Sequence, residues 1–163
     1  MQRGWSGGIY VLVSVGAYVL AVGLAACGGG SGRLSKAAYR SGLAKISRQA
    51  DSAHRAVDRG AAKAQTVSDV QAVLRRFAAA EDRLGDEVSK LKAPSDAEAA
   101  NAELARSERD DAAEIRALLP KLSRYKTVQQ AFGFLQRLGH TKGGREEDAA
   151  LAQLKKLGYT QGS

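Results

Sequence analysis

Residues 39–61, YRSGLAKISRQADSAHRAVDRGA, decide the fold class because their apolar side chains recur with helical spacing. These side chains lie three or four residues apart, at Tyr39, Leu43, Ile46, Ala50, Ala53, Val57 and Ala61. Most of the charged residues in the stretch fall outside this stripe. A period near 3.6 with one apolar face predicts an amphipathic helix that packs against other helices. Ser35 is in position to cap the start of this helix.

The sequence that follows repeats the same pattern twice. A break near Gln65 leads to residues 66–69 (TVSD), which predict a capping box at the start of a second helix. Pro94 is expected to end that helix, because the residue before a proline disfavours helical backbone. Residues 95–98 (SDAE) predict a second capping box, and Pro120 is expected to end or kink the third helix. The two apolar stripes comprise Val70, Leu74, Phe77, Leu84, Val88 and Leu91, then Ala100, Leu104, Ala112, Ile115 and Leu118.

The last third of the chain carries a weaker helical pattern interrupted by glycine. Apolar positions follow Thr127, fade across residues 139–144 (GHTKGG), and resume before Gly158, which is a natural C-terminal stop. Gly139 and Gly143 are consistent with a turn between two short helices, or with close packing of one long interrupted helix. We slightly favour the long helix over residues 127–157.

The fold class that follows is all-α. Residues 35–163 predict one domain, an antiparallel bundle of about four helices with short loops. Alanine is abundant and aromatic side chains make up only 6% of the chain, which suits closely packed helices better than a sheet. The acidic run at residues 146–148 (EED) is expected to form the first turn of a terminal helical segment.

The N-terminal region has the three parts of a secretory signal. Arg3 and the free amino terminus supply positive charge, and residues 9–24 contain no charged side chain. Ala25 and Ala26 then provide the small residues that a signal peptidase accepts next to its cleavage point, and Cys27 follows. We therefore assign residues 1–26 to a helical signal peptide, residues 27–34 to a lipidated Cys with a flexible Gly-rich linker, and residues 35–163 to the bundle.

The pattern Leu24-Ala25-Ala26-Cys27 resembles the bacterial lipobox. The resemblance implies that the Cys27 thiol receives a diacylglycerol through a thioether and that cleavage before Cys27 frees an amine for palmitoylation. Three other readings compete with it. Uncleaved, residues 9–26 are just long enough to span a membrane. An ordinary secretory peptide would release a protein with a free thiol, and the lone Cys could also stand there by chance.

A wider resemblance covers nearly the whole chain. The order of Cys27 and its glycine run, then residues 34–39 (LSKAAY), then Ala-rich helices ending in residues 156–159 (KLGY), resembles small exported lipoproteins of actinobacteria. Many of those proteins carry two further cysteines, whose counterparts here are Ser47 and the tail at residues 161–163. The resemblance implies a helical domain and transfers no catalytic residue.

The sequence predicts no catalytic set and no cofactor. Hydrolase and phosphate-loop motifs are absent. The sharpest chemical alternative is a carboxylate-bridged metal site, because Asp51 and His54 have a spacing used in di-iron bundles. Further acids stand at Glu81, Glu108 and Asp111, but His140 lies among glycines and completes no second pair. We favour a solvent-exposed His54 beside surface acids, and either an exposed turn or a wet cleft at the polar middle of the third helix.

Basic residues are concentrated in the last third of the chain. Removal of residues 1–26 leaves 24 basic and 17 acidic side chains. Nucleic acid is not an expected partner of an exported domain, so the basic C-terminal third predicts contact with anionic lipid or an anionic wall polymer, or simply a solvated surface. These residues are Lys121, Arg124, Lys126, Arg137, Lys142, Arg145, Lys155 and Lys156.

Taken together, these patterns predict a lipid-anchored bacterial protein on the extracytoplasmic face of the cell membrane. Its expected role is non-catalytic binding or scaffolding in the envelope. The alternative function is an extracytoplasmic helical module that binds a small ligand or a metal. Residue 28 is glycine rather than aspartate, which leaves both the inner and the outer membrane open as destinations.

Overall fold

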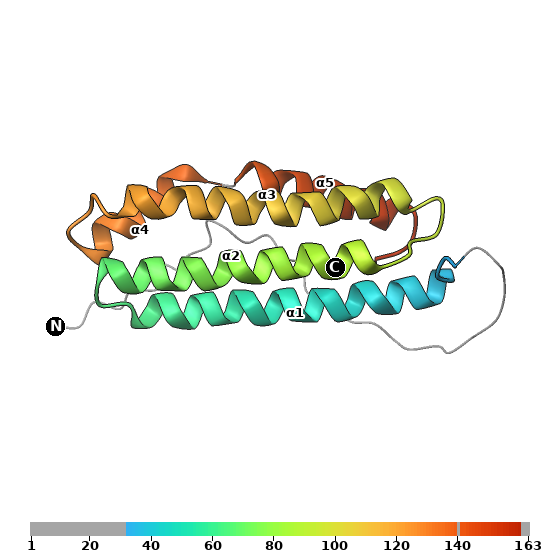
Figure 1. Cartoon of the computed structure of the whole chain (residues 1–163), viewed down its shortest axis with the longest axis horizontal. Coiled ribbons are helices and arrows are strands. Elements are labelled where there is room, and N and C mark those ends of the chain that lie inside the picture. Colours follow the sequence, from blue (N-terminus) through green and yellow to red (C-terminus); the bar gives the residue numbers. More distant parts are fainter. Residues whose placement is uncertain (1–31, 140, 161–163) are drawn as a thin grey trace.

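The computed structural model describes residues 32–139 and 141–160, and within these residues the chain is helical and contains no strand (Figure 1). The all-α bundle predicted from the sequence is confirmed. The predicted signal peptide, Cys27 and residues 28–31 of the predicted linker lie outside the described residues. The helices are α1 (Lys36–Lys63), α2 (Val67–Lys90), α3 (Glu98–Leu122), α4 (Val128–Leu138) and α5 (Lys142–Lys156).

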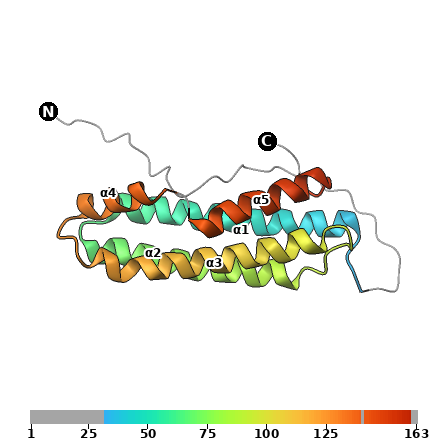
Figure 2. The same ribbon diagram turned by 90° about the horizontal axis from the view of Figure 1, so that it is seen from above.

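The five helices of the described residues build a four-helix type of bundle in which α4 and α5 together take the place of a fourth helix. Helices α2 and α3 pack along their lengths as the central antiparallel pair, with α1 against α2 and α5 against α3. In Figure 2, α4 and α5 follow one another along the same side of the bundle, above α2 and α3. No helix among the described residues is both long enough and apolar enough to cross a membrane.

The predicted helix starts at Ser35, Thr66 and Thr127 are confirmed. Each side chain accepts a hydrogen bond from the backbone N–H three residues later. The backbone N–H of Thr66 in turn donates to the carboxylate of Asp69, which completes the capping box. These caps satisfy backbone donors that the first turn of a helix leaves unpaired.

The capping box predicted at residues 95–98 is wrong. Ala97 is the N-cap of α3 and makes no side-chain cap. Asp96 instead accepts a hydrogen bond of 2.6 Å from the hydroxyl of Tyr159, and Glu98 forms an ion pair of 2.7 Å with Arg33. Contacts to distant parts of the chain have replaced the local cap.

The long interrupted helix favoured for residues 127–157 is also wrong. Gly139 has a φ of 65°, which ends α4, and Thr141 caps a separate α5. Gly143 allows close helix packing, the other explanation considered, because a Cβ built there would lie 2.5 Å from the backbone N of Asp111 on α3. The acidic run at residues 146–148 lies beyond the first turn of α5, which contains no acid, so that expectation is wrong as well.

Gly158 ends α5 as predicted. Its φ is 73°, and the N–H groups of Gly158 and Tyr159 donate to the carbonyls of Lys155 and Leu154. This pair of bonds is the Schellman motif. It turns Tyr159 back into the bundle, where its ring meets the ring of Tyr39 edge-on, with centroids 5.2 Å apart.

The apolar core consists of two clusters, one toward each end of the bundle. The first lies near the start of α1 and is closed by Leu34, whose N–H donates to the carbonyl of Lys92 at 2.8 Å. The second lies where α2 and α3 meet α4. The two clusters contain Tyr39, Leu43, Ile46, Leu84, Val88, Leu104, Ala150, Leu154 and Tyr159, and Val70, Leu74, Phe77, Ala78, Ala112, Ile115, Leu122, Ala131 and Leu135, among others.

Candidate functional site

A layer of ionisable side chains crosses the bundle between the two apolar clusters. Its members are His54 of α1, Glu81 of α2, Glu108 and Asp111 of α3, and Glu147 of α5. We call these five residues the polar layer. Glu81 is 4% exposed and Glu108 is 5% exposed, whereas the other three are half-buried. Burying a carboxylate costs free energy unless the group is paired or protonated, so the protonation of these groups has to be considered.

Glu81 and Glu108 share a hydrogen bond across the α2–α3 interface. Burial raises the pKa of Glu81 to about 6, and the bond that it accepts from Glu108 opposes this rise. Burial raises the pKa of Glu108 well above its usual range, and the bond that it donates to Glu81 raises it further. Glu108 therefore carries the proton that the pair shares.

The other two carboxyl groups of the polar layer are also easier to protonate than usual. Burial raises the pKa of Glu147 to about 8, with smaller contributions from the charges of Glu81 and Asp111. Burial also raises the pKa of Asp111, although the hydrogen bond from the Thr141 hydroxyl opposes the rise. Because burial raises the pKa of all four carboxyl groups, the polar layer holds protons more tightly than exposed carboxyl groups do.

His54 is half-buried, and the prediction of an exposed His54 beside surface acids is wrong. Its side chain is 15% exposed and its ring lies 5.2 Å from that of Phe77. Burial lowers the pKa of His54, and the nearby charge of Asp51 opposes this only in part. Its Nε2 is 3.8 Å from Oε1 of Glu81, too long for a hydrogen bond. Neither Nδ1 of His54 nor Oε1 of Glu81 has a hydrogen-bond partner among the described residues.

The geometry of the polar layer does not reproduce a metal centre. Among residues 32–139 and 141–160, no three His, Cys, Asp or Glu side chains are placed to hold one ion. His140 lies outside the described residues. Of the six ionisable groups that the sequence singled out, the structure brings together His54, Glu81, Glu108 and Asp111, and it adds Glu147. What the described groups can do chemically is hold and release protons.

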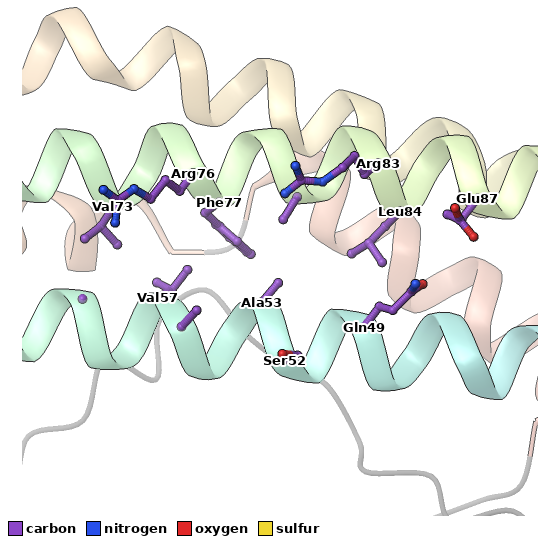
Figure 3. A pocket seen from close by; sticks show the side chains of 13 residues that line it. Gln49, Ser52, Ala53, Val57, Val73, Arg76, Phe77, Arg83, Leu84 and Glu87 are labelled. Carbon is purple, nitrogen blue, oxygen red and sulfur yellow. The ribbon is translucent and has the colours of Figure 1, made fainter.

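A second feature is a groove of about 470 Å³ between α1 and α2. In Figure 3 the side chains of Val57 and Ala53 point from α1 toward α2, and those of Phe77 and Leu84 point back toward α1. The groove is lined by Gln49, Ser52, Ala53, Ala56, Val57, Gly60, Val73, Arg76, Phe77, Ala80, Arg83, Leu84 and Glu87. A volume of this size lies within the range of small-ligand sites.

The groove exists because α1 and α2 meet closely only on either side of it. A Cβ at Gly42 would lie 2.8 Å from Leu91, and a Cβ at Gly60 would lie 2.7 Å from Val73. Between these two contacts several of the lining positions are small, with alanine at residues 53, 56 and 80. Short side chains do not fill the space between the two helices, so part of the interface stays open.

The basic residues of the C-terminal third belong to neither feature. All eight are exposed, and they are spread over the end of α3, the α3–α4 connection, α4 and α5. Lys142 forms an ion pair of 3.3 Å with Glu146, one helical turn away. They form an exterior surface rather than a pocket.

One signal for the polar layer was present in the sequence. Glu81 and Glu108 occupy positions where the apolar stripes of α2 and α3 skip a turn, so the helical period itself placed them inside. The groove had no comparable signal, because alanines on a helix face are compatible with close packing and with a gap alike. Comparison with protein-family models, curated proteins and solved structures found no match to this chain.

Proposed function

We propose that this chain is a bacterial lipoprotein, held by covalent lipid on Cys27 at the extracytoplasmic face of the cell membrane. The observation that carries the proposal is the sequence Leu24-Ala25-Ala26-Cys27, which begins at the last of the sixteen uncharged residues 9–24. Two or more acyl chains on one residue give stable anchoring, because each buried methylene contributes about 0.8 kcal/mol.

The start of the folded domain supports this arrangement. Arg33 donates a hydrogen bond of 3.0 Å to the carbonyl of Ala93, and Leu34 packs on the first apolar cluster. The bundle therefore begins six residues after Cys27. Residues 28–32 (GGGSG) remain as a spacer of about 10–15 Å in a Gly-rich chain. The proposed anchor would hold the bundle close to the lipid headgroups.

We further propose that the bundle acts by binding rather than by catalysis. The α1–α2 groove supports a binding role, because it is an open space lined by apolar and charged side chains on a rigid helical pair. Of the two ligand types considered from the sequence, the groove favours a small organic ligand over a metal ion.

The anchor is tested by the intact mass of the mature protein purified from its membrane. We expect a polypeptide that begins at Cys27 and carries the added mass of a diacylglycerol and an N-linked acyl chain. A mature chain that begins at another residue, or one with an unmodified Cys27 thiol, would contradict the proposal.

The basic C-terminal third is proposed to contact anionic lipid beside the anchor. A soluble form beginning at residue 32 is expected to bind phosphatidylglycerol vesicles at low salt and to be released as the salt concentration rises, since each nearby Lys or Arg contributes about 1 kcal/mol. Replacing Lys155 and Lys156 by glutamine should weaken sedimentation with these vesicles. The matched pair Lys45→Gln and Arg48→Gln on α1 should not, and an equal effect of both pairs would refute a localised surface.

A further inference from the structure

The groove between α1 and α2 combines an apolar floor with cationic rims, and this combination is informative about a ligand. Phe77 and Leu84 are buried at its floor, whereas Val57 and Val73 on its walls are only half-buried. Part of each wall side chain is therefore still accessible to solvent. A ligand that covers them would remove apolar surface from water, which is favourable in proportion to the area covered.

The groove is long and narrow. On α1 it extends from Gln49 to Gly60, a stretch of twelve residues or about 16 Å of helix. One end is closed where Gly60 packs against Val73. A helix with its side chains is about 10–12 Å across, so a partner helix would lie over the groove rather than within it. The space suits a single extended alkyl chain.

Two arginines on α2 give the groove its charge. Arg76 and Arg83 both line it and are exposed, and no ion pair or hydrogen bond within the described residues involves either guanidinium. By contrast, Arg109 and Arg116 of α3 each pair with an aspartate of α2. Arg76 and Arg83 are seven residues apart, about 10 Å along the same face of the helix. Glu87 is the single acid of the lining, so the groove is net cationic.

From these features we propose that the α1–α2 groove binds a long-chain fatty acid, with the alkyl chain on the Phe77–Leu84 floor beside Val57 and the carboxylate at Arg76 or Arg83. Arginine binds carboxylates through paired N–H donors, which gives both affinity and selection of an anionic head. The inference deepens the proposed function and rests on it for one point, the membrane as the source of the ligand.

The test uses the whole chain in phosphatidylcholine nanodiscs and a photoreactive palmitate as the probe. We expect saturable crosslinking that maps to residues 49–60 of α1 and 73–87 of α2. Unlabelled palmitate should compete for this site at least tenfold better than hexadecanol, which has the same chain without the charge. Crosslinking that does not saturate, that spreads over all helices, or that hexadecanol suppresses equally well would overturn the proposal.

Matched substitutions distinguish the contribution of the apolar groove to binding from that of the two arginines. Ala56→Leu places a larger side chain in the groove and is expected to reduce labelling at least tenfold, whereas Ala62→Leu, at an exposed position of α1 outside the groove, should not. Replacing both Arg76 and Arg83 by glutamine should weaken binding about tenfold or more, whereas Arg75→Gln should not. Circular dichroism verifies the helix content of each variant. If the arginine pair and Arg75 behave alike, the proposed headgroup site is wrong.

A Cys27→Ser chain distinguishes this inference from the proposed anchor. The groove is built only from α1 and α2, so its labelling should be unchanged in Cys27→Ser. A clear gain of groove labelling in that variant would show that the protein's own lipid occupies the groove in wild type, which would overturn a free fatty acid as the ligand. Failure of the anchor would instead appear as an unmodified Cys27 with groove labelling intact.

Discussion

The substitution Gly143→Ala is expected to lower the free energy of unfolding by about 2–3 kcal/mol, although alanine favours a helix over glycine by about 1 kcal/mol. The added Cβ would lie 2.5 Å from the backbone N of Asp111 and 2.8 Å from the carbonyl O of Ser107. Both atoms belong to the backbone of α3 and cannot rotate away. Helix α5 would have to move outward and uncover Ala150 and Leu154 in the first apolar cluster.

Gly133→Ala is the matched control for this prediction. Gly133 lies within α4, and an added Cβ there would meet only the terminal nitrogen of Arg137, at 3.6 Å. Alanine at this position should therefore stabilise the protein by about 0.5–1 kcal/mol. Urea unfolding followed by circular dichroism measures both variants. An effect of Gly143→Ala as favourable as that of Gly133→Ala would refute the close α3–α5 contact.

The protein is expected to lose stability as the pH rises from 6.5 to 8. A carboxyl whose pKa is raised in the folded state binds its proton more tightly there than in the unfolded chain, so its contribution is lost as the pH rises toward the folded-state value. That value is about 6 for Glu81 and about 8 for Glu147, and the pKa of Glu108 is raised well above its usual range. If the folded state holds one more proton than the unfolded chain over this interval, the free energy of unfolding falls by up to about 2 kcal/mol.

His54 contributes with the opposite sign and in a different pH range. Its pKa is lowered by burial, so it destabilises the fold as the pH falls below 6.5. The interval from 6.5 to 8 therefore reports the carboxyl groups of the polar layer. A free energy of unfolding that stays constant or rises over this interval would contradict a protonated polar layer.

Glu108→Gln tests which residue carries the shared proton. Glutamine keeps a donor for Glu81 and cannot ionise, so we expect unfolding at pH 8 to require about 1–2 kcal/mol more than in wild type. At about pH 5, where Glu108 is already protonated, the two proteins should be similar. Glu103→Gln on the same helix, at a half-buried position facing Arg106, should keep the wild-type pH dependence.

The sequence was sufficient to predict the elements whose signals are local. Ser35, Thr66 and Thr127 cap helices because their side chains and the following N–H groups are neighbours in the chain. The apolar stripes of α1, α2 and α3 likewise predicted most of the core, since the helical period alone decides which side chains share a face.

The failures occurred where distant contacts override local preference. In the predicted box at positions 95–98, Asp96 binds Tyr159 and Glu98 binds Arg33, and both partners are more than sixty positions away. The sequence left open whether Gly139 and Gly143 form a turn or permit close packing. In the structure Gly139 forms the turn and Gly143 permits the close packing. The polar middle of α3 proved to be neither an exposed turn nor a wet cleft, since Glu108 is buried against Glu81.

Cys27, the proposed site of the lipid anchor, lies outside the described residues. Metabolic labelling with a radioactive fatty acid, comparing wild type with Cys27→Ser, tests this anchor most directly. We expect strong labelling of the wild-type protein, resistant to denaturing extraction, and none in Cys27→Ser, because the thiol is the only attachment point for the diacylglycerol. Equal covalent labelling of the two proteins, or no labelling of either, would contradict a lipoprotein.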